Sequence, residues 1–60
     1  MIRHEYLEQL DRYLRKLPKA DYEEAMDYFT EYFDEAGVEN EAAVMAELGT
    51  PKEAAHDILS

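Results

Sequence analysis

Apolar side chains recur every three or four residues along the first part of the chain, a spacing that predicts an amphipathic helix. This helix is expected over residues 2–17, with charged residues on the side opposite its apolar stripe. Because proline lacks a backbone N–H and restricts the residue before it, Pro18 should end the helix at Leu17. The apolar stripe comprises Ile2, Tyr6, Leu7, Leu10, Tyr13, Leu14 and Leu17.

A second helix is predicted to start between Pro18 and Asp21 and to stop at Gly37. Asp21 followed by Glu24 resembles a capping box, which favours a helix start there. Gly37 stands where a helix commonly ends in a left-handed residue. The stripe expected to be buried comprises Tyr22, Ala25, Met26, Phe29, Phe33 and Ala36.

Two shorter helices are predicted in the rest of the chain. The first covers residues 41–48, with Asn40 as its N-cap, Val44 and Leu48 pointing inward, and Gly49 as its stop. The second begins at the sequence Thr50-Pro51-Lys52-Glu53, which supplies a cap, a proline at the first position and a glutamate at the third. Its apolar face comprises Ala54, Ala55, Ile58 and Leu59.

These elements predict an all-α fold, a compact bundle of four helices, two long and two short, joined by tight turns. The β-branched residues are few and scattered, so strands are not expected. A helical hairpin crossed by a short helix–turn–helix unit is the natural packing. With 60 residues there is room for one domain, spanning positions 1–60.

Composition restricts the chemistry that this domain can perform. The chain has no cysteine, which excludes disulfides, CxxC redox chemistry and cysteine-based zinc sites. It contains neither an HExxH motif nor a glycine-rich phosphate loop, and its carboxylates do not follow the calcium-loop spacing. His4 is expected in the frayed first turn and His56 on the outward side of the last helix, and neither has partner spacing for acid–base catalysis. We therefore expect no metal, no cofactor and no enzymatic activity.

Charge is the most distinctive property of the sequence. Fifteen acidic residues against six basic ones give a net charge of −9, which disfavours direct binding of nucleic acid. Residues 20–47 hold ten of the acidic side chains and no basic one. The simpler interpretation is compensation by the basic residues of the first helix. The alternative is an acidic docking face for a basic protein.

Tyr28 and Tyr32 fall at the border between the second helix's apolar stripe and its acidic face. Tyrosine is a frequent anchor at protein interfaces, although both rings could simply cover the core with their hydroxyls in water. The candidate partner-binding residues are therefore Tyr28, Tyr32, Glu24, Glu31 and Glu35. The small core and the unequal charge of the first two helices also predict a homodimer.

Several pieces of the sequence together resemble the HAAS domain, a small helical N-terminal domain of uncharacterised bacterial membrane proteins associated with PadR-like transcriptional regulators. The resemblance covers nearly all of the sequence. It rests on the set rather than on any one piece, because each piece alone is ordinary helix-capping sequence. The matching residues are Leu17-Pro18, the stretch from Tyr28-Phe29 through Asp34-Glu35-Ala36-Gly37, Glu47-Leu48-Gly49-Thr50-Pro51, Ala54-Ala55 and Ile58.

The resemblance implies a non-catalytic signalling or interaction module on the cytoplasmic side of a bacterial membrane. The domain would be the N-terminal soluble part of a longer membrane protein, touching the membrane only through segments outside this sequence. Its partner would be a PadR-like regulator, another soluble protein or a second copy. The acidity leaves one alternative function open, a free-standing inhibitor that mimics nucleic acid and binds a basic protein.

Overall fold

The computed structural model describes residues 2–59, and within that range it contains four α-helices and no strand. The all-α fold with two long and two short helices is confirmed. A single 3₁₀ turn, η1, precedes the third helix. The elements are α1 (Arg3–Leu14), α2 (Lys19–Ala36), η1 (Val38–Asn40), α3 (Glu41–Leu48) and α4 (Pro51–Leu59).

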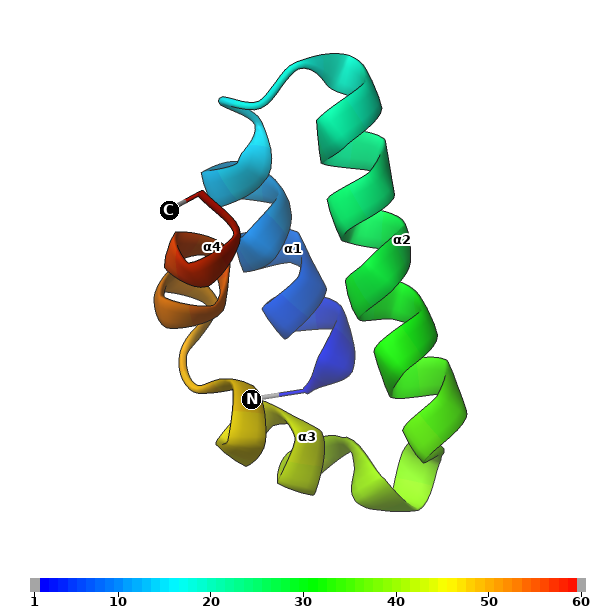
Figure 1. Cartoon of the computed structure of the whole chain (residues 1–60). Helices are drawn as coiled ribbons and strands as arrows, with labels where there is room; N and C mark the ends of the chain where they lie inside the picture. The colour runs from blue at the N-terminus through cyan, green and yellow to red at the C-terminus, as the bar shows by residue number, and fades with distance from the viewer. Residues whose placement is uncertain (1, 60) are drawn as a thin grey trace.

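The helices form a hairpin closed by a shorter unit, as the pattern of turns predicts. Helices α1 and α2 run in opposite directions, α3 crosses one end of the pair, and α4 returns along α1 (Figure 1). Helix α1 therefore lies between α2 and α4 and packs against both. This central position of α1 determines which surfaces of α2 and α4 remain open.

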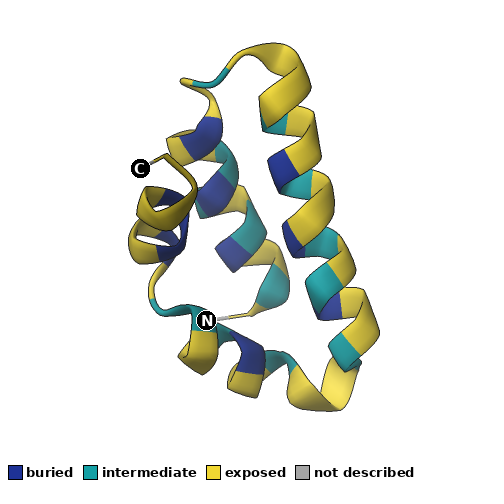
Figure 2. Ribbon diagram, viewed as in Figure 1, coloured by how far each residue is buried: buried dark blue, intermediate teal, exposed yellow. Residues whose placement is uncertain are grey.

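The core consists of the side chains that α1, α2, α3 and α4 direct toward one another (Figure 2). The Tyr6 and Phe33 rings meet edge to face at 5.7 Å, an arrangement that aromatic quadrupoles favour. Two adjacent alanines let α4 approach α1 closely. The buried residues of the core are Tyr6, Leu10, Leu14, Ala25, Phe29, Phe33, Val44, Ala54 and Ala55.

The start of α4 confirms the predicted capping box. The backbone N–H of Glu53 donates to the Thr50 hydroxyl at 3.1 Å, and the Thr50 N–H donates to the Glu53 carboxylate at 3.1 Å. These two bonds satisfy donors that have no partner inside the helix. Gly49 precedes the box with φ of 84°, a conformation that L side chains rarely adopt.

The first helix is shorter than predicted, because it ends at Leu14 rather than Leu17. In a continuing helix the Leu14 carbonyl would accept a hydrogen bond from the N–H of residue 18. That residue is proline and has no N–H, so Leu14 accepts instead from Leu17 at 3.0 Å. The prediction was wrong because proline affects the turn before it as well as its own position.

Two predicted helix starts are confirmed in position, but neither has the predicted side-chain cap. Helix α2 begins at Lys19 after Pro18, and no side chain caps it. Asp21 lies inside the first turn, where its negative charge suits the helix dipole. Asn40 does occupy the N-cap position of α3, but its amide donates backward to the Ala36 carbonyl at 2.8 Å. The extra 3₁₀ turn brings Asn40 next to the end of α2, so its side chain satisfies that end instead.

Gly37 stops α2 as predicted, but in a different conformation. Its φ of 88° is positive, while its ψ of 160° is extended rather than left-handed helical. Ile58 and Leu59, expected on the buried face of α4, are 42% and 40% exposed. Ile58 lines one surface hollow together with Tyr28, and Leu59 lines another together with Tyr13. Both tyrosines are part exposed, so the core does not extend this far along α4.

Candidate functional site

A shallow groove of about 260 Å³ lies where α2, α3 and α4 meet. We call it the tyrosine groove. It exists because α4 packs chiefly on α1, which leaves the facing sides of α2 and α4 incompletely covered. The lining residues are Tyr28, Phe29 and Tyr32 from α2, Glu47 and Leu48 from α3, and Ala54, Asp57 and Ile58 from α4.

Tyr28 is the most exposed aromatic side chain of this groove, with 51% of its surface accessible. Its ring meets Phe29 edge to face at 5.1 Å and Tyr32 at 6.1 Å. Its hydroxyl makes no hydrogen bond to another residue in the described range. Tyr28 therefore presents a ring held by its neighbours and a hydroxyl available to a partner.

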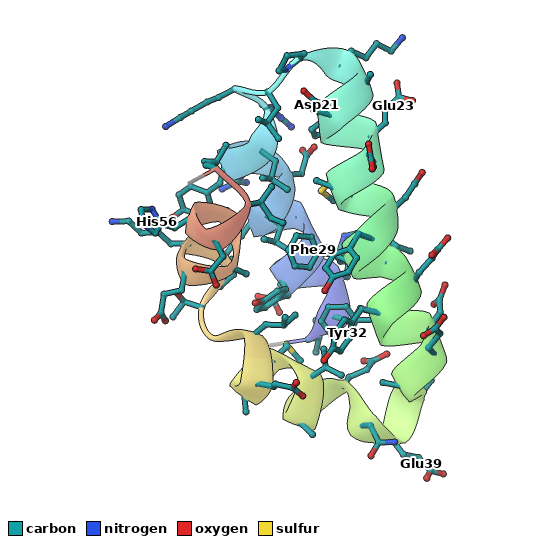
Figure 3. The ribbon with its side chains drawn as sticks, in the orientation of Figure 1. Asp21, Glu23, Phe29, Tyr32, Glu39 and His56 are labelled. Atoms are coloured by element: carbon teal, nitrogen blue, oxygen red, sulfur yellow. The ribbon has the colours of Figure 1, made fainter. Side chains whose placement is uncertain are left out.

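Tyr32 has a different role, although it lies one helical turn from Tyr28. Tyr32 points from α2 toward the other helices (Figure 3). Its hydroxyl donates to the Glu47 carboxylate at 3.0 Å and so connects α2 to α3. That hydrogen bond is the main reason why the pKa of Tyr32 is raised, with burial and nearby charge adding to it. The phenol consequently stays neutral and keeps its proton as the donor in this bond.

The three predicted glutamates, Glu24, Glu31 and Glu35, are all exposed on α2. Glu24 comes four residues before Tyr28, Glu31 three residues after it and Glu35 seven residues after it. Helix geometry therefore places all three along the same side of α2 as Tyr28. Within residues 2–59, none of the three forms an ion pair or hydrogen bond. We call them the acidic strip; it runs beside the tyrosine groove without lining it.

Part of the acidic charge is compensated inside the domain. Arg3 pairs with Asp34 and lies 3.8 Å from Glu41, and Lys19 lies 3.9 Å from Glu23. Arg12 in α1 and Arg15 directly after it pair with residues four positions earlier instead, Arg12 with Glu8 and Arg15 with Asp11. Internal compensation therefore accounts for some carboxylates of residues 20–47, but it does not reach the acidic strip.

Arg3 is a structural residue that the sequence pattern alone did not single out. Its guanidinium lies 5.7 Å from the centre of the Phe33 ring and 3.5 Å from the Thr30 carbonyl, besides its pairing with Asp34. It thereby links the start of α1 to the last turns of α2. A positive charge in the first turn of a helix is unfavourable, because the helix dipole is positive at that end. The position of Arg3 in the sequence therefore indicates that it pairs with residues outside its own helix.

A larger hollow of about 580 Å³ lies along α4 and the end of α1. Its lining mixes both signs of charge, with Lys16 and Lys52 among three carboxylates, and its apolar part is Tyr13, Ala55, Leu48 and Leu59. His56 also lines it and points away from α2 (Figure 3). Because its charges largely balance, this hollow offers less selectivity for a charged partner than the tyrosine groove does.

The structure brings the five predicted residues to one side of α2 and adds others to them. Sequence reasoning missed the contributions of Glu47, Leu48, Asp57 and Ile58, because they join Tyr28 only through tertiary packing. Among residues 2–59, no group of three or more His, Cys, Asp or Glu side chains could hold a metal ion. In the same range, no helix is long and apolar enough to cross a membrane.

The family model of the HAAS domain matches residues 5–57. The chain belongs to the HAAS family. The match includes all three glutamates of the acidic strip. It also includes every residue of the tyrosine groove except Ile58. Searches of curated proteins and of solved structures gave no significant match.

Proposed function

We propose that this HAAS domain is a non-catalytic interaction module that binds another protein through the tyrosine groove and the adjoining acidic strip. The observation that carries the proposal is the half-exposed Tyr28 ring, held against Phe29 and Tyr32 beside the 42% exposed Ile58. Exposed aromatic and aliphatic side chains that converge in one groove are typical of interaction sites.

The absence of catalysis is part of the same proposal. The groove is lined by phenols, carboxylates and apolar side chains. Its Tyr32 hydroxyl does donate to the Glu47 carboxylate, but the pKa of this phenol is raised, which opposes the ionisation that a nucleophile needs. The perturbed groups support structural roles: the raised pKa of Tyr32 follows from its bond to Glu47, and the lowered pKa of Glu53 from its bonds to Thr50. This chemistry suits recognition better than turnover.

Family membership supports a proposal for the cellular setting. The domain would be the N-terminal, cytoplasmic part of a longer bacterial membrane protein and would couple that protein to a soluble partner such as a PadR-like regulator. The full-length gene tests the setting, since a downstream apolar stretch of about 20 residues supports a membrane anchor. A stop codon directly after the domain would contradict it.

Affinity capture from the source cell tests the proposed function. The wild-type chain and its Tyr28→Ala, Glu31→Lys and Tyr13→Ala variants serve as baits, and captured proteins are identified by mass spectrometry and then purified for direct binding. Tyr13 is the matched control, because it is a part-exposed tyrosine outside the groove. We expect one protein to bind wild type and Tyr13→Ala but to be lost with the other two variants. Equal binding to all four baits contradicts the proposed site.

A further inference from the structure

The chemistry of the tyrosine groove specifies its partner, and this step rests on the proposed function. We infer that the groove binds a basic amphipathic helix of another protein, which inserts an apolar side chain between Tyr28 and Ile58 and directs lysines or arginines toward the surrounding carboxylates. Apolar fit, charge and the shape of the site each support this occupant.

The apolar part of the groove is suited to a single large side chain. Its floor is formed by Phe29, Leu48 and Ala54, of which Phe29 and Ala54 are buried core residues. Tyr28 and Ile58 stand above this floor with about half of their surfaces exposed, at 51% and 42%. A leucine or an aromatic ring placed there would cover both residues without disturbing the core.

The charge around this apolar centre has one sign. The lining includes two carboxylates, Glu47 on α3 and Asp57 on α4, and, within residues 2–59, no lysine or arginine. The acidic strip of Glu24, Glu31 and Glu35 continues the same sign along α2. A partner that carries basic residues beside its apolar anchor gains electrostatic attraction, whereas an acidic partner is repelled.

A helix fits the shape of the site better than an extended segment. The described part of the chain has no strand, so it provides no sheet edge to which an extended peptide could add. The groove is bordered by the helices α2 and α4, which both pack on α1. A helix laid between them can place anchors at three- and four-residue intervals, the spacing used when amphipathic helices bind grooves.

The basic half of α1 in a second copy of the chain is a less suitable occupant. Arg12 and Arg15 lie near the part-exposed Tyr13, but they already pair with Glu8 and Asp11, at 3.2 Å and 2.7 Å. To bind the groove of another copy they would have to give up those partners. A foreign helix with unpaired basic residues has no such cost.

A designed peptide provides the test, because this chain contains no tryptophan and a tryptophan in the peptide reports binding without background. The probe is a helix of about 18 residues with tryptophan and leucines at three- and four-residue intervals and lysines on both flanks. One control peptide replaces every lysine by glutamate. A second control keeps the lysines and replaces the apolar anchors by glutamine.

The expected result is a blue-shifted, saturable tryptophan signal with the basic amphipathic peptide and none with either control peptide. Tyr28→Ala and Glu31→Lys should each weaken binding by about tenfold or more, while Tyr13→Ala and Glu39→Lys should change it less than about twofold. Raising the salt concentration from about 0.05 M to about 0.5 M should also weaken binding. Amide shifts in a ¹H–¹⁵N spectrum should map to residues of the tyrosine groove.

Three outcomes would overturn the inference. One is equal affinity for the acidic and the basic peptide; another is equal loss in the Tyr28→Ala and Tyr13→Ala variants. The third is a concentration-dependent dimer in sedimentation that Tyr28→Ala dissociates, since the occupant would then be a second copy. If the peptide fails while capture of a cellular protein still depends on Tyr28, the proposed function stands and only the partner's chemistry is wrong.

Discussion

The hydroxyl of Tyr6 donates a hydrogen bond of 2.8 Å to the main-chain carbonyl of Gly49. The ring is 1% exposed, and its burial, together with the nearby charge of Glu53, raises the pKa of the phenol. Tyr6 is therefore a neutral donor that fixes the first turns of α1 to the turn between α3 and α4. In this way one core residue also sets the position at which α4 begins.

Replacing Tyr6 by phenylalanine should destabilise the domain by about 1–2 kcal/mol, because the Gly49 carbonyl loses its partner in a partly buried place. Urea unfolding followed by circular dichroism measures the change. Tyr13→Phe is the control, since Tyr13 is part exposed and its hydroxyl makes no hydrogen bond among the described residues. An unchanged midpoint for Tyr6→Phe would show that the bond contributes nothing.

Alanine at either glycine should also destabilise the fold, but to different extents. Both residues have positive φ with extended ψ, a region almost confined to glycine, and each substitution should cost about 1–3 kcal/mol. At Gly37 an added Cβ meets no atom within 4 Å, so backbone strain is the whole effect. At Gly49 it would lie 3.2 Å from the Glu53 carboxylate.

Gly49→Ala should therefore be the more damaging of the two, because it also disturbs the Thr50–Glu53 cap. Thermal unfolding of the two variants side by side measures the difference. A larger loss at Gly37 would contradict this explanation, since only Gly49 has the carboxylate beside it.

Glu53 makes the start of α4 sensitive to acid. The Thr50 backbone N–H donates to the carboxylate and holds its pKa below the ordinary 4.5, and the Thr50 side chain adds to the effect. Because the folded pKa is the lower one, this contribution is complete above the unfolded pKa and is lost as pH falls through the folded value. The stability difference between wild type and Glu53→Gln should therefore shrink as pH drops below 4.5.

Unfolding in urea at a series of pH values from neutral to acid gives this difference directly. Glu39→Gln is the control, because Glu39 is exposed and makes no hydrogen bond or ion pair in the described range. Its difference from wild type should not follow the profile of Glu53→Gln. A Glu53→Gln difference that stays constant through the acid range would exclude a role for the carboxylate charge.

Arg3 should stabilise the contact between α1 and α2 through its geometry as well as its charge. Arg3→Ala is expected to cost about 1 kcal/mol, a modest value because the side chain is 27% exposed and its ion pairs are partly screened. Arg3→Lys should recover only part of the loss, since lysine stacks less well on Phe33 and cannot form a guanidinium's multiple bonds. Unfolding at low and high salt separates the charge effect; full recovery by lysine would argue against the geometric part.

A mutation in the tyrosine groove should reduce the stability of the domain much less than a mutation in the core. Tyr28→Ala is expected to change stability by less than about 1 kcal/mol, because the side chain is 51% exposed. Phe33→Ala should cost about 3–5 kcal/mol, since Phe33 is fully buried at 0%. Thermal unfolding tests both values. A large loss for Tyr28→Ala would mean that its ring supports the core rather than a partner.

The helices could be predicted because their limits depend on local rules. Apolar spacing, glycine stops and the Thr50–Glu53 box act within one or two turns, and the limits of α3 agree with the structure at both ends. The errors arose where a residue had two possible partners. Asn40 could cap either the helix after it or the one before it, and only the intervening 3₁₀ turn decides between them.

The candidate site was predictable only in part, for a similar reason. Helix periodicity placed Tyr28, Tyr32 and the acidic strip on one side of α2 without any knowledge of the neighbours. Ile58 was expected in the core, and its position at the edge of the groove depends on how α4 lies against α1. That packing joins segments far apart in the sequence, which no local pattern records.

The contact between α1 and α4 also constrains how the chain acquires its structure. Tyr6 and Gly49 are 43 positions apart, so their bond closes a loop over most of the sequence, whereas the α1–α2 hairpin needs only local closure. The hairpin can therefore form early, but the side of α1 that faces α4 stays exposed to water until α4 packs against it. During refolding, the amides of α4 should accordingly become protected from hydrogen exchange later than those of α1 and α2.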